Sequence, residues 1–301
     1  NVDKPKSKNY YWHGRLCLFV KREEKQPAIQ HFLDMLKICA KYVINIKIIR
    51  RIKINILMLD IESSPLTVHS WGLWEQNIGL NQILDTGGVL CWAAKWHNKK
   101  PLFYNSIYKT SKKQMLVEIH NLLNQADAVV HYNGTRYDVP MLNREFLIAG
   151  MSPVAPFKQT DLLKVCRNRF RFPSNKLDHI ASALGLGNKR KVGHELWIGC
   201  MQNDPQSWQE MERYNKQDVK LLEAVYDKLL PWIKDHANYN LYGDSSLVCP
   251  NCGSSHYQRR GIAITRTLRY ARYQCQNKDC GTWFRGAKSQ GPKQTEKYVQ
   301  I

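Results

Sequence analysis

A run of apolar residues that ends in two carboxylates constrains the fold of this chain most strongly. From Ile52 the sequence first alternates and then becomes continuously apolar up to Leu59, which predicts a strand in the middle of a sheet. Asp60 and Glu62 follow, and because side chains alternate along a strand, both carboxylates point to the same face. Carboxylates at a buried strand are costly unless a cation compensates them. The pattern therefore predicts a sheet that carries a cation site.

The segments that follow predict an α/β layer structure. Two strand-like segments follow Leu59, and after them come an amphipathic helix that begins at Lys112, a short strand and further helices. The predicted strands are residues 88–96, 101–105 and 128–131, and the predicted helices are residues 112–125, 139–149, 176–184 and 206–230. This order of elements indicates a mixed sheet flanked by helices, and the chain is long enough for a second, smaller domain.

Two further acidic residues fall at positions that favour a shared site. Asp138 follows a predicted strand at the start of a helix, where free N–H groups favour ligand binding. Tyr214 and Asp218 are four residues apart and share one helix face. Each feature alone has an ordinary interpretation as a solvated turn, a helix cap or a surface spacing. Together they favour an all-oxygen site for two Mg²⁺ or Mn²⁺ ions, which stabilise both oxygens of a phosphodiester displacement.

These motifs resemble those of the DEDD superfamily of 3′–5′ exonucleases, which have an RNase H-like fold. Residues 60–62 match its Asp-x-Glu motif, and residues 133–138 match its second motif, an Asn followed by an aromatic-Asp pair. Residues 214–218 match the Tyr-x-x-x-Asp motif of the tyrosine-containing (DEDDy) subgroup. The sister subgroup has a His where this chain has Arg213. Residues 176–186 also resemble the exonuclease domains of family B polymerases.

The resemblance covers residues 54–232 and implies a mixed five-stranded sheet with defined site residues. The implied residues are Asp60, Glu62, Asp138 and Asp218 as metal ligands, Tyr214 as the residue that positions the attacking water, and Asn133 as a nucleic-acid contact. The basic run at residues 189–191 has two interpretations, a solvated loop and a nucleic-acid contact, and the solvated loop is favoured.

Four of the nine cysteines stand in two close pairs, whereas the other five are scattered. Cys249 and Cys252 form the first pair, and Cys275 and Cys280 form the second after 22 intervening residues. This spacing predicts a closed, structural Cys₄ site for one Zn²⁺ ion. Two disulfides, or four idle thiols, are less favoured alternatives. Zinc binding at such sites is worth roughly 10–16 kcal/mol, enough to fold a unit without a core of its own.

The segment between the cysteine pairs interleaves arginine with tyrosine. Arginine neutralises phosphates and tyrosine stacks on bases, so this segment predicts nucleic-acid binding. The candidate contacts are Arg266, Arg269, Tyr270, Arg272 and Tyr273. The segment resembles the zinc ribbons of transposase-type DNA-binding proteins, and a ribbon that binds only protein is the alternative.

The formal net charge of +20 is concentrated at the two ends of the chain. Residues 1–55 carry 13 basic and 4 acidic residues, and residues 245–301 carry 10 and 2, which leaves 22 and 19 between them. This distribution favours a polyanionic partner over a role in solubility alone. No secretory signal or membrane span is evident, because basic residues interrupt the most apolar stretch. We therefore expect an intracellular, cytoplasmic protein, in the host cytoplasm if the source is viral.

The sequence thus predicts a metal-dependent 3′–5′ exonuclease that acts on DNA, with single-stranded 3′ ends favoured. Its expected parts are a basic extension of unknown role, a nuclease domain, a linker, a zinc ribbon and a polar tail. Their boundaries are residues 1–51, 52–237, 238–247, 248–287 and 288–301. An exoribonuclease and a catalytically silent nucleic-acid-binding protein are the alternatives. The transposase-like ribbon favours DNA, and the complete set of five active-site residues disfavours a silent protein.

Overall fold

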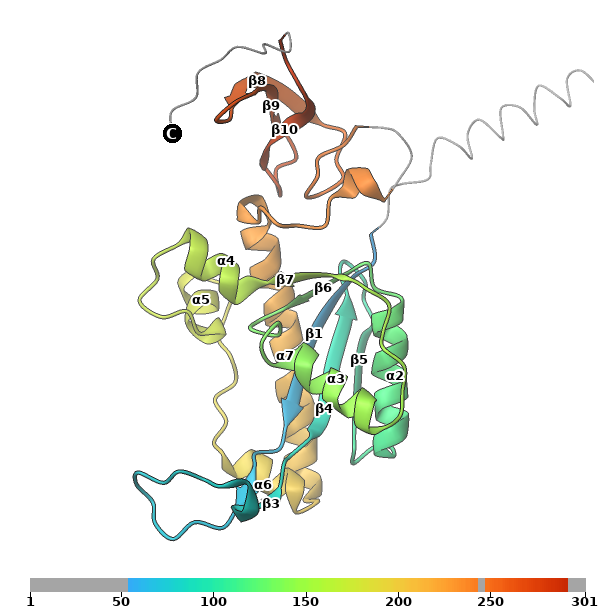
Figure 1. Cartoon of the computed structure of the whole chain (residues 1–301), viewed down its shortest axis with the longest axis vertical. Helices are drawn as coiled ribbons and strands as arrows, with labels where there is room; N and C mark the ends of the chain where they lie inside the picture. Colours follow the sequence, from blue (N-terminus) through green and yellow to red (C-terminus); the bar gives the residue numbers. More distant parts are fainter. Residues whose placement is uncertain (1–53, 243–246, 292–301) are drawn as a thin grey trace, which may run out of the picture. The chain divides into compact units, whose positions relative to one another are not determined.

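The computed structural model describes residues 54–242 and 247–291 (Figure 1). The predicted basic extension, residues 243–246 of the predicted linker and residues 292–301 of the predicted tail lie outside the described residues. Across the part of the chain that is described, no helix combines the length and apolar character needed to cross a membrane.

Five strands form the mixed sheet that the sequence predicted. The central strand β1 (Ile56–Ser63) pairs antiparallel with β4 (Val89–Trp96), which pairs antiparallel with β5 (Leu102–Ser106). On its other side β1 pairs parallel with β6 (Ala128–His131), which pairs parallel with β7 (Lys158–Asp161). The order is β5-β4-β1-β6-β7, so the apolar run that predicted a central strand does occupy the middle of the sheet.

The long helix α7 (Pro205–Leu229) covers one face of the sheet, together with α4 (Leu162–Arg169) and α5 (Leu177–Ala183). Their apolar side chains form one buried cluster with Ile56 and Met58 of β1. Figure 1 shows α7 running along β1 and β4. Because side chains alternate along β1, the residues two and four positions after Met58 also face α7.

The opposite face of the sheet is covered by α2 (Lys112–Asn124) and α3 (Asp138–Ile148). Leu57 and Leu59 of β1 pack there against apolar side chains of both helices. Helix α2 begins where Ser111 caps it, since the Ser111 hydroxyl accepts a hydrogen bond from the Gln114 amide. The two helical layers bury both faces of the sheet, which is typical of α/β domains.

Short elements complete this domain. A small hairpin of β2 (Thr67–Val68) and β3 (Ile83–Asp85) lies between β1 and β4, with η1 (Leu80–Gln82) before β3. Helix α6 (Glu195–Met201) precedes α7, which begins at Pro205 because Asp204 caps the amide of Ser207. After α7 come two 3₁₀ turns, η2 (Leu230–Trp232) and η3 (Tyr239–Leu241).

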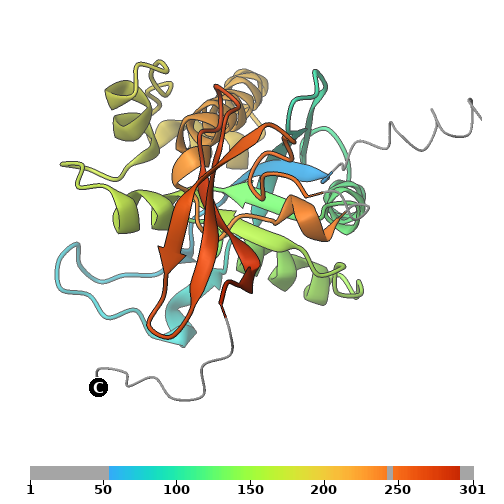
Figure 2. The same cartoon turned by 90° about the horizontal axis from the view of Figure 1, so that it is seen from above.

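A small antiparallel sheet forms the C-terminal part of the described chain. Its strands are β8 (Tyr257–Ile264), β9 (Arg269–Cys275) and β10 (Trp283–Ser289), in the order β10-β9-β8. They lie side by side in Figure 1 and Figure 2. The side chain of Asn251, before β8, donates hydrogen bonds to the carbonyls of Leu230 and Ile233. These bonds tie the segment before β8 to the turn that follows α7.

Candidate metal and nucleic-acid sites

The face of β1 that meets α7 carries the first two predicted ligands. Asp60 and Glu62 follow Met58 at intervals of two, so they share its face of the sheet. Asp218 lies on the side of α7 that packs against this face and is 1% exposed. Ligand oxygens of these three residues all lie within 4.8 Å of one another. The central strand and the long helix thus bring three carboxylates together, and these form the carboxylate cluster.

Asp138, the fourth predicted ligand, reaches β1 from the start of α3. Its Oδ1 atom accepts a hydrogen bond from the backbone N–H of Ile61, at 3.2 Å. Asp138 is 6% exposed, and its carboxylate therefore lies against the backbone between Asp60 and Glu62. Burial raises the pKa of Asp138 to about 6, although the amides of Ile61 and Asp138 itself oppose the shift.

The electrostatics of the carboxylate cluster favour a bound cation. Burial raises the pKa of Asp60 well above its usual value, and the charges of Glu62 and Asp138 add to this effect. Burial also raises the pKa of Glu62 to about 8. Asp218 Oδ1 is buried and accepts no hydrogen bond. Carboxylates crowded in this way repel one another, and a hard divalent cation with oxygen ligands is the group that suits them.

Two residues that the sequence analysis did not select support this cluster. Asn215 is fully buried and its Nδ2 donates to Asp60 Oδ2 at 2.6 Å, which fixes that carboxylate. Trp197 of α6 packs edge-on against the ring of Tyr214, at 5.8 Å between centroids. The spacing of Asn215 three residues before Asp218 was a signal for a shared helix face. Trp197 had no comparable signal, because its contact depends on how α6 packs.

Lys189 corrects the interpretation of the basic run as a solvated loop. Its Nζ atom lies 2.5 Å from Asp218 Oδ2 and 4.6 Å from the centre of the Tyr214 ring. Arg190 instead pairs with Glu210, and Lys191 is exposed. Of these three residues, only Lys189 gains more from the buried carboxylates than it loses in hydration. This difference depends on three-dimensional contacts, so it leaves no periodic pattern in the sequence.

A cleft of about 550 Å³ adjoins the carboxylate cluster. Asp60 and Asn133 line it on the side of the sheet, and Arg167, Lys176 and Lys189 supply positive charge. Asn133 has a φ of 69°, a left-handed conformation that asparagine tolerates, and its N–H donates to Asp161. The cleft combines cations with polar groups beside the carboxylates, so it suits an anionic ligand.

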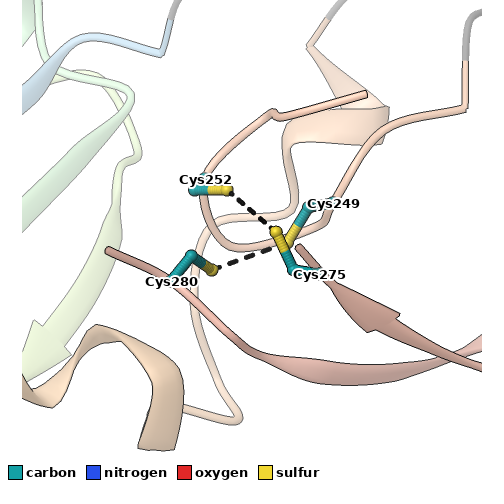
Figure 3. A group of neighbouring side chains, drawn as sticks. All are labelled: Cys249, Cys252, Cys275 and Cys280. Carbon is teal, nitrogen blue, oxygen red and sulfur yellow. Dashed lines mark hydrogen bonds between the residues drawn. The ribbon is translucent and has the colours of Figure 1, made fainter. Parts of the chain in front are cut away.

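The four paired cysteines converge at the base of the small sheet (Figure 3). Cys249 Sγ lies 3.8 Å from Cys280 Sγ, and Cys252 Sγ lies 3.7 Å from Cys275 Sγ. These distances fit the edge of a tetrahedron about a zinc ion, since Zn–S bonds of about 2.3 Å place the sulfurs about 3.8 Å apart. They are too long for disulfides, so the structure favours the predicted zinc site.

The predicted ribbon contacts differ in their exposure. Three arginines, Arg266, Arg269 and Arg272, are exposed, whereas Tyr273 is half-buried. Tyr270 is 8% exposed, and the guanidinium of Arg285 lies 3.8 Å from the centre of its ring. The arginines of the small sheet are therefore better placed than Tyr270 to meet a nucleic acid. Arg285 itself was not among the predicted contacts.

Fold and site together define an RNase H-like nuclease fold with a C-terminal zinc finger. The chain belongs to the RNase H superfamily, because the family model RNase_H_2, described as RNase_H superfamily, matches residues 79–230. An Ogr/Delta-like zinc finger matches residues 248–290, the region of the four cysteines.

Two other comparisons complete the picture. No curated protein matches the chain. Among solved structures, the chain is similar to the family B DNA polymerase from the hyperthermophilic archaeon Pyrobaculum calidifontis. The identity is 17% and the TM-score 0.46, over 60% of this chain and 25% of the polymerase. The chain thus spans about a quarter of the length of that polymerase.

Proposed function

We propose that this protein is a metal-dependent 3′–5′ exonuclease of the DEDDy type that shortens DNA from single-stranded 3′ ends. The observation that carries the proposal is the convergence of Asp60, Glu62 and Asp218 within 4.8 Å. Asp138 joins them through its hydrogen bond to β1, and Tyr214 lies one helical turn before Asp218. This arrangement supports the proposal, because the resemblance to the exonuclease superfamily implies these five residues as the site.

The four carboxylates would hold two Mg²⁺ or Mn²⁺ ions. Bound there, such ions supply positive charge to the attacking and leaving oxygens of an in-line phosphodiester displacement. Asn215 keeps Asp60 oriented through its 2.6 Å hydrogen bond. Burial raises the pKa of the Tyr214 hydroxyl, which favours its protonated form. Tyr214 then orients the attacking water by hydrogen bonding rather than by removing a proton.

The adjoining cleft would receive the 3′-terminal nucleotide. Arg167 and Lys176 offer charge to phosphates, whereas Leu163 and Leu177 offer apolar surface to a sugar or base. The zinc ribbon, which we place at residues 248–287 after a nuclease domain of residues 52–237, would hold the strand through its arginines. DNA is the proposed substrate because the ribbon resembles those of transposase-type DNA-binding proteins.

A panel of substrates tests the proposal. We expect the purified protein with Mg²⁺ or Mn²⁺ to shorten linear single-stranded DNA stepwise to mononucleotides. Strands blocked at the 3′ end and circular strands should resist, and matched RNA strands test the choice of nucleic acid. Degradation of circles as fast as linear strands would exclude an exonuclease, and preferential degradation of RNA would exclude the DNA assignment.

Matched variants of α7 separate chemistry from binding. Asp218→Asn is expected to lower the hydrolysis rate by at least about 10²–10³-fold while leaving DNA affinity intact, because a group that stabilises developing charge is lost. Asp227→Asn is the control, since Asp227 lies on the same helix and pairs with His97 on the surface. Full activity of Asp218→Asn would refute the assignment of the carboxylate cluster as the active site.

A further inference from the structure

The ammonium group of Lys189 lies among the carboxylates that would hold metal. Lys189 belongs to the connection between α5 and α6, and its backbone N–H donates to Asp178 Oδ1 at 2.7 Å. Its side chain is 29% exposed and extends to Asp218 Oδ2, 2.5 Å away. The backbone hydrogen bond fixes where this side chain starts, and the ion pair fixes where it ends.

Lys189 acts electrostatically on the whole cluster. Its Nζ atom lies 2.5 Å from Asp218 Oδ2, and ligand oxygens of Asp60, Glu62 and Asp218 lie within 4.8 Å of one another. It is therefore the positive charge that offsets their mutual repulsion. A lysine ammonium is a compact, mobile point charge, so it neutralises a carboxylate without the fixed fork geometry of arginine.

The segment that carries Lys189 has no regular secondary structure and borders open space. Residues 184–194 lie between the end of α5 and the start of α6 and include no helix or strand. Gly187 has a φ of 99°, a conformation that other residues rarely adopt. The side chain also borders the cleft of about 550 Å³, so it has space to move away from Asp218.

We propose that Lys189 is a built-in competitor of the divalent cations and sets the metal affinity of the carboxylate cluster. Its ammonium holds Asp218 Oδ2, so a divalent ion bound to the same carboxylate would lie close to it and be repelled by its charge. Metal binding therefore displaces Lys189 from Asp218. By linkage, the factor by which the metal weakens this ion pair is also the factor by which the ion pair weakens metal binding. The inference depends on the metal site of the proposed function but not on its hydrolytic step.

Titration of the zinc-loaded, full-length protein with Mn²⁺ in the absence of nucleic acid tests the competition. We expect Lys189→Met to bind Mn²⁺ about tenfold more tightly than the wild type, within the usual range of coupling between sites. Lys189→Arg keeps the charge and should bind no more tightly than the wild type. Lys191→Met is the matched control, because it removes the same charge from an exposed position in the same segment. Unchanged, weaker or absent Mn²⁺ binding by Lys189→Met overturns the proposal.

Thermal unfolding adds a signature that a purely structural lysine lacks. Without Mg²⁺, Lys189→Met should melt at a lower temperature than the wild type, because its carboxylates lose their compensating charge. With saturating Mg²⁺ the two proteins should melt together, whereas an equal deficit in both conditions overturns the proposal. If Lys189→Met binds Mn²⁺ more tightly but the wild-type protein hydrolyses no nucleic acid, the exonuclease proposal is refuted and the competition between Lys189 and metal is supported. If the wild type hydrolyses DNA but Lys189→Met binds Mn²⁺ no more tightly, only the competition is refuted.

Discussion

The carboxylate cluster and the cysteine quartet are candidate metal sites built in opposite ways. The carboxylates of the cluster come from β1 and α7, with Asp138 of α3 beside them, and a large core of packed helices and strands holds these distant parts of the sequence in place. The cysteines come from two short turns of a small sheet, where the core cluster consists of the four cysteines and Phe284. In the first site the fold positions the ligands, whereas in the second the ligands form the core.

This difference separates what each metal contributes. In the carboxylate cluster, packing of apolar side chains forces like charges together, so the fold bears a cost that a cation relieves. In the cysteine quartet, the bond energy of the metal replaces the hydrophobic burial that a sheet of this size lacks. Removal of divalent cations should therefore abolish function at the first site and structure at the second.

Of the effects that distinguish the two sites, loss of zinc from the cysteine quartet is expected to be the largest. Cys280→Ala should lose the zinc ion and unfold the β8–β10 sheet, since zinc binding is worth roughly 10–16 kcal/mol in small zinc units. The RNase H-like domain should remain folded. Hydrogen exchange followed by mass spectrometry, together with zinc content, measures both outcomes. Cys200→Ala is the control, because Cys200 is equally buried but lies in the nuclease domain. Protection of β9 amides in zinc-free protein would show that the ribbon does not depend on the metal.

The pH dependence of stability gives the next largest effect and concerns the carboxylate cluster and Asp138 beside it. Burial raises the pKa of Glu62 from 4.5 to about 8 and that of Asp138 from 3.8 to about 6. For each group, between its usual and its raised pKa, the folded state binds more protons than the unfolded state. The free energy of unfolding therefore falls as pH rises through that interval. One pKa unit corresponds to about 1.4 kcal/mol. The free energy of unfolding of the Mg²⁺-free protein should therefore fall by on the order of a few kcal/mol between pH 5 and 8, the range that these two shifts span.

Urea unfolding of the zinc-loaded protein at several pH values measures this slope. Glu62→Gln should flatten it, whereas Glu75→Gln, a change at an exposed position, should leave it intact. The lowered pKa of His131 contributes a slope of opposite sign, which cancels when variant and wild type are compared. Saturating Mg²⁺ should restore stability at high pH. A slope that is the same in Glu62→Gln and the wild type would show that the fold tolerates the charged cluster without cost.

Periodic patterns account for what the sequence predicted well. The apolar run of β1 predicted the central strand, because a strand buried on both faces requires such a run. Alternation along β1 predicted that Asp60 and Glu62 share one face, and the four-residue spacing on α7 predicted the same for Tyr214 and Asp218. That the two faces meet was implied by the resemblance. Close cysteine pairs predicted a metal site in the same way, since ligand spacing within a turn is a local property.

Features without a periodic signal escaped prediction. The strand β7 (Lys158–Asp161) has the polar sequence Lys-Gln-Thr-Asp, so the fifth strand of the expected sheet could not be located. The loop after β2 exposes Trp71 and Trp74, at 98% and 83%, which no burial rule anticipates. Lys189 was assigned to solvent because the partner of a loop side chain is decided by tertiary packing. Tyr270 was selected for its chemistry, although its position in β9 buries it.

A smaller effect, confined to the rate of hydrolysis, is expected from the hydroxyl of Tyr214. Tyr214→Phe should lower kcat about 10²-fold, because an oriented hydrogen bond to the attacking water is lost. Its Mn²⁺ affinity and its melting temperature should change little. Tyr226→Phe is the matched control on α7, where the hydroxyl bonds His236 at 2.6 Å. That variant should keep its kcat and lose about 1 kcal/mol of stability. A normal kcat in Tyr214→Phe would remove the tyrosine from the proposed mechanism.

The smallest expected effect concerns the arginines of the zinc ribbon. Arg272 and Arg285 stand directly opposite each other on β9 and β10. Like charges in such pairs are unfavourable, and each guanidinium lies over an aromatic ring, Arg272 over Trp283 and Arg285 over Tyr270. A bound phosphate group would offset this unfavourable pairing, so we expect these two arginines to contact a nucleic-acid backbone.

Single substitutions of these two arginines show whether the ribbon binds DNA or only protein. Arg272→Ala and Arg285→Ala should each weaken binding of single-stranded DNA. The slope of the logarithm of the binding constant against the logarithm of the salt concentration should become less steep by about 0.7 per lost phosphate contact. Their kcat at saturating substrate should equal that of the wild type, the reverse of the result for Tyr214→Phe. Arg213→Ala, an exposed arginine of α7, is the control for net charge. Unchanged affinity and salt dependence in both ribbon variants would leave protein binding as the role of the ribbon, and the DNA strand would then be held by the nuclease domain alone.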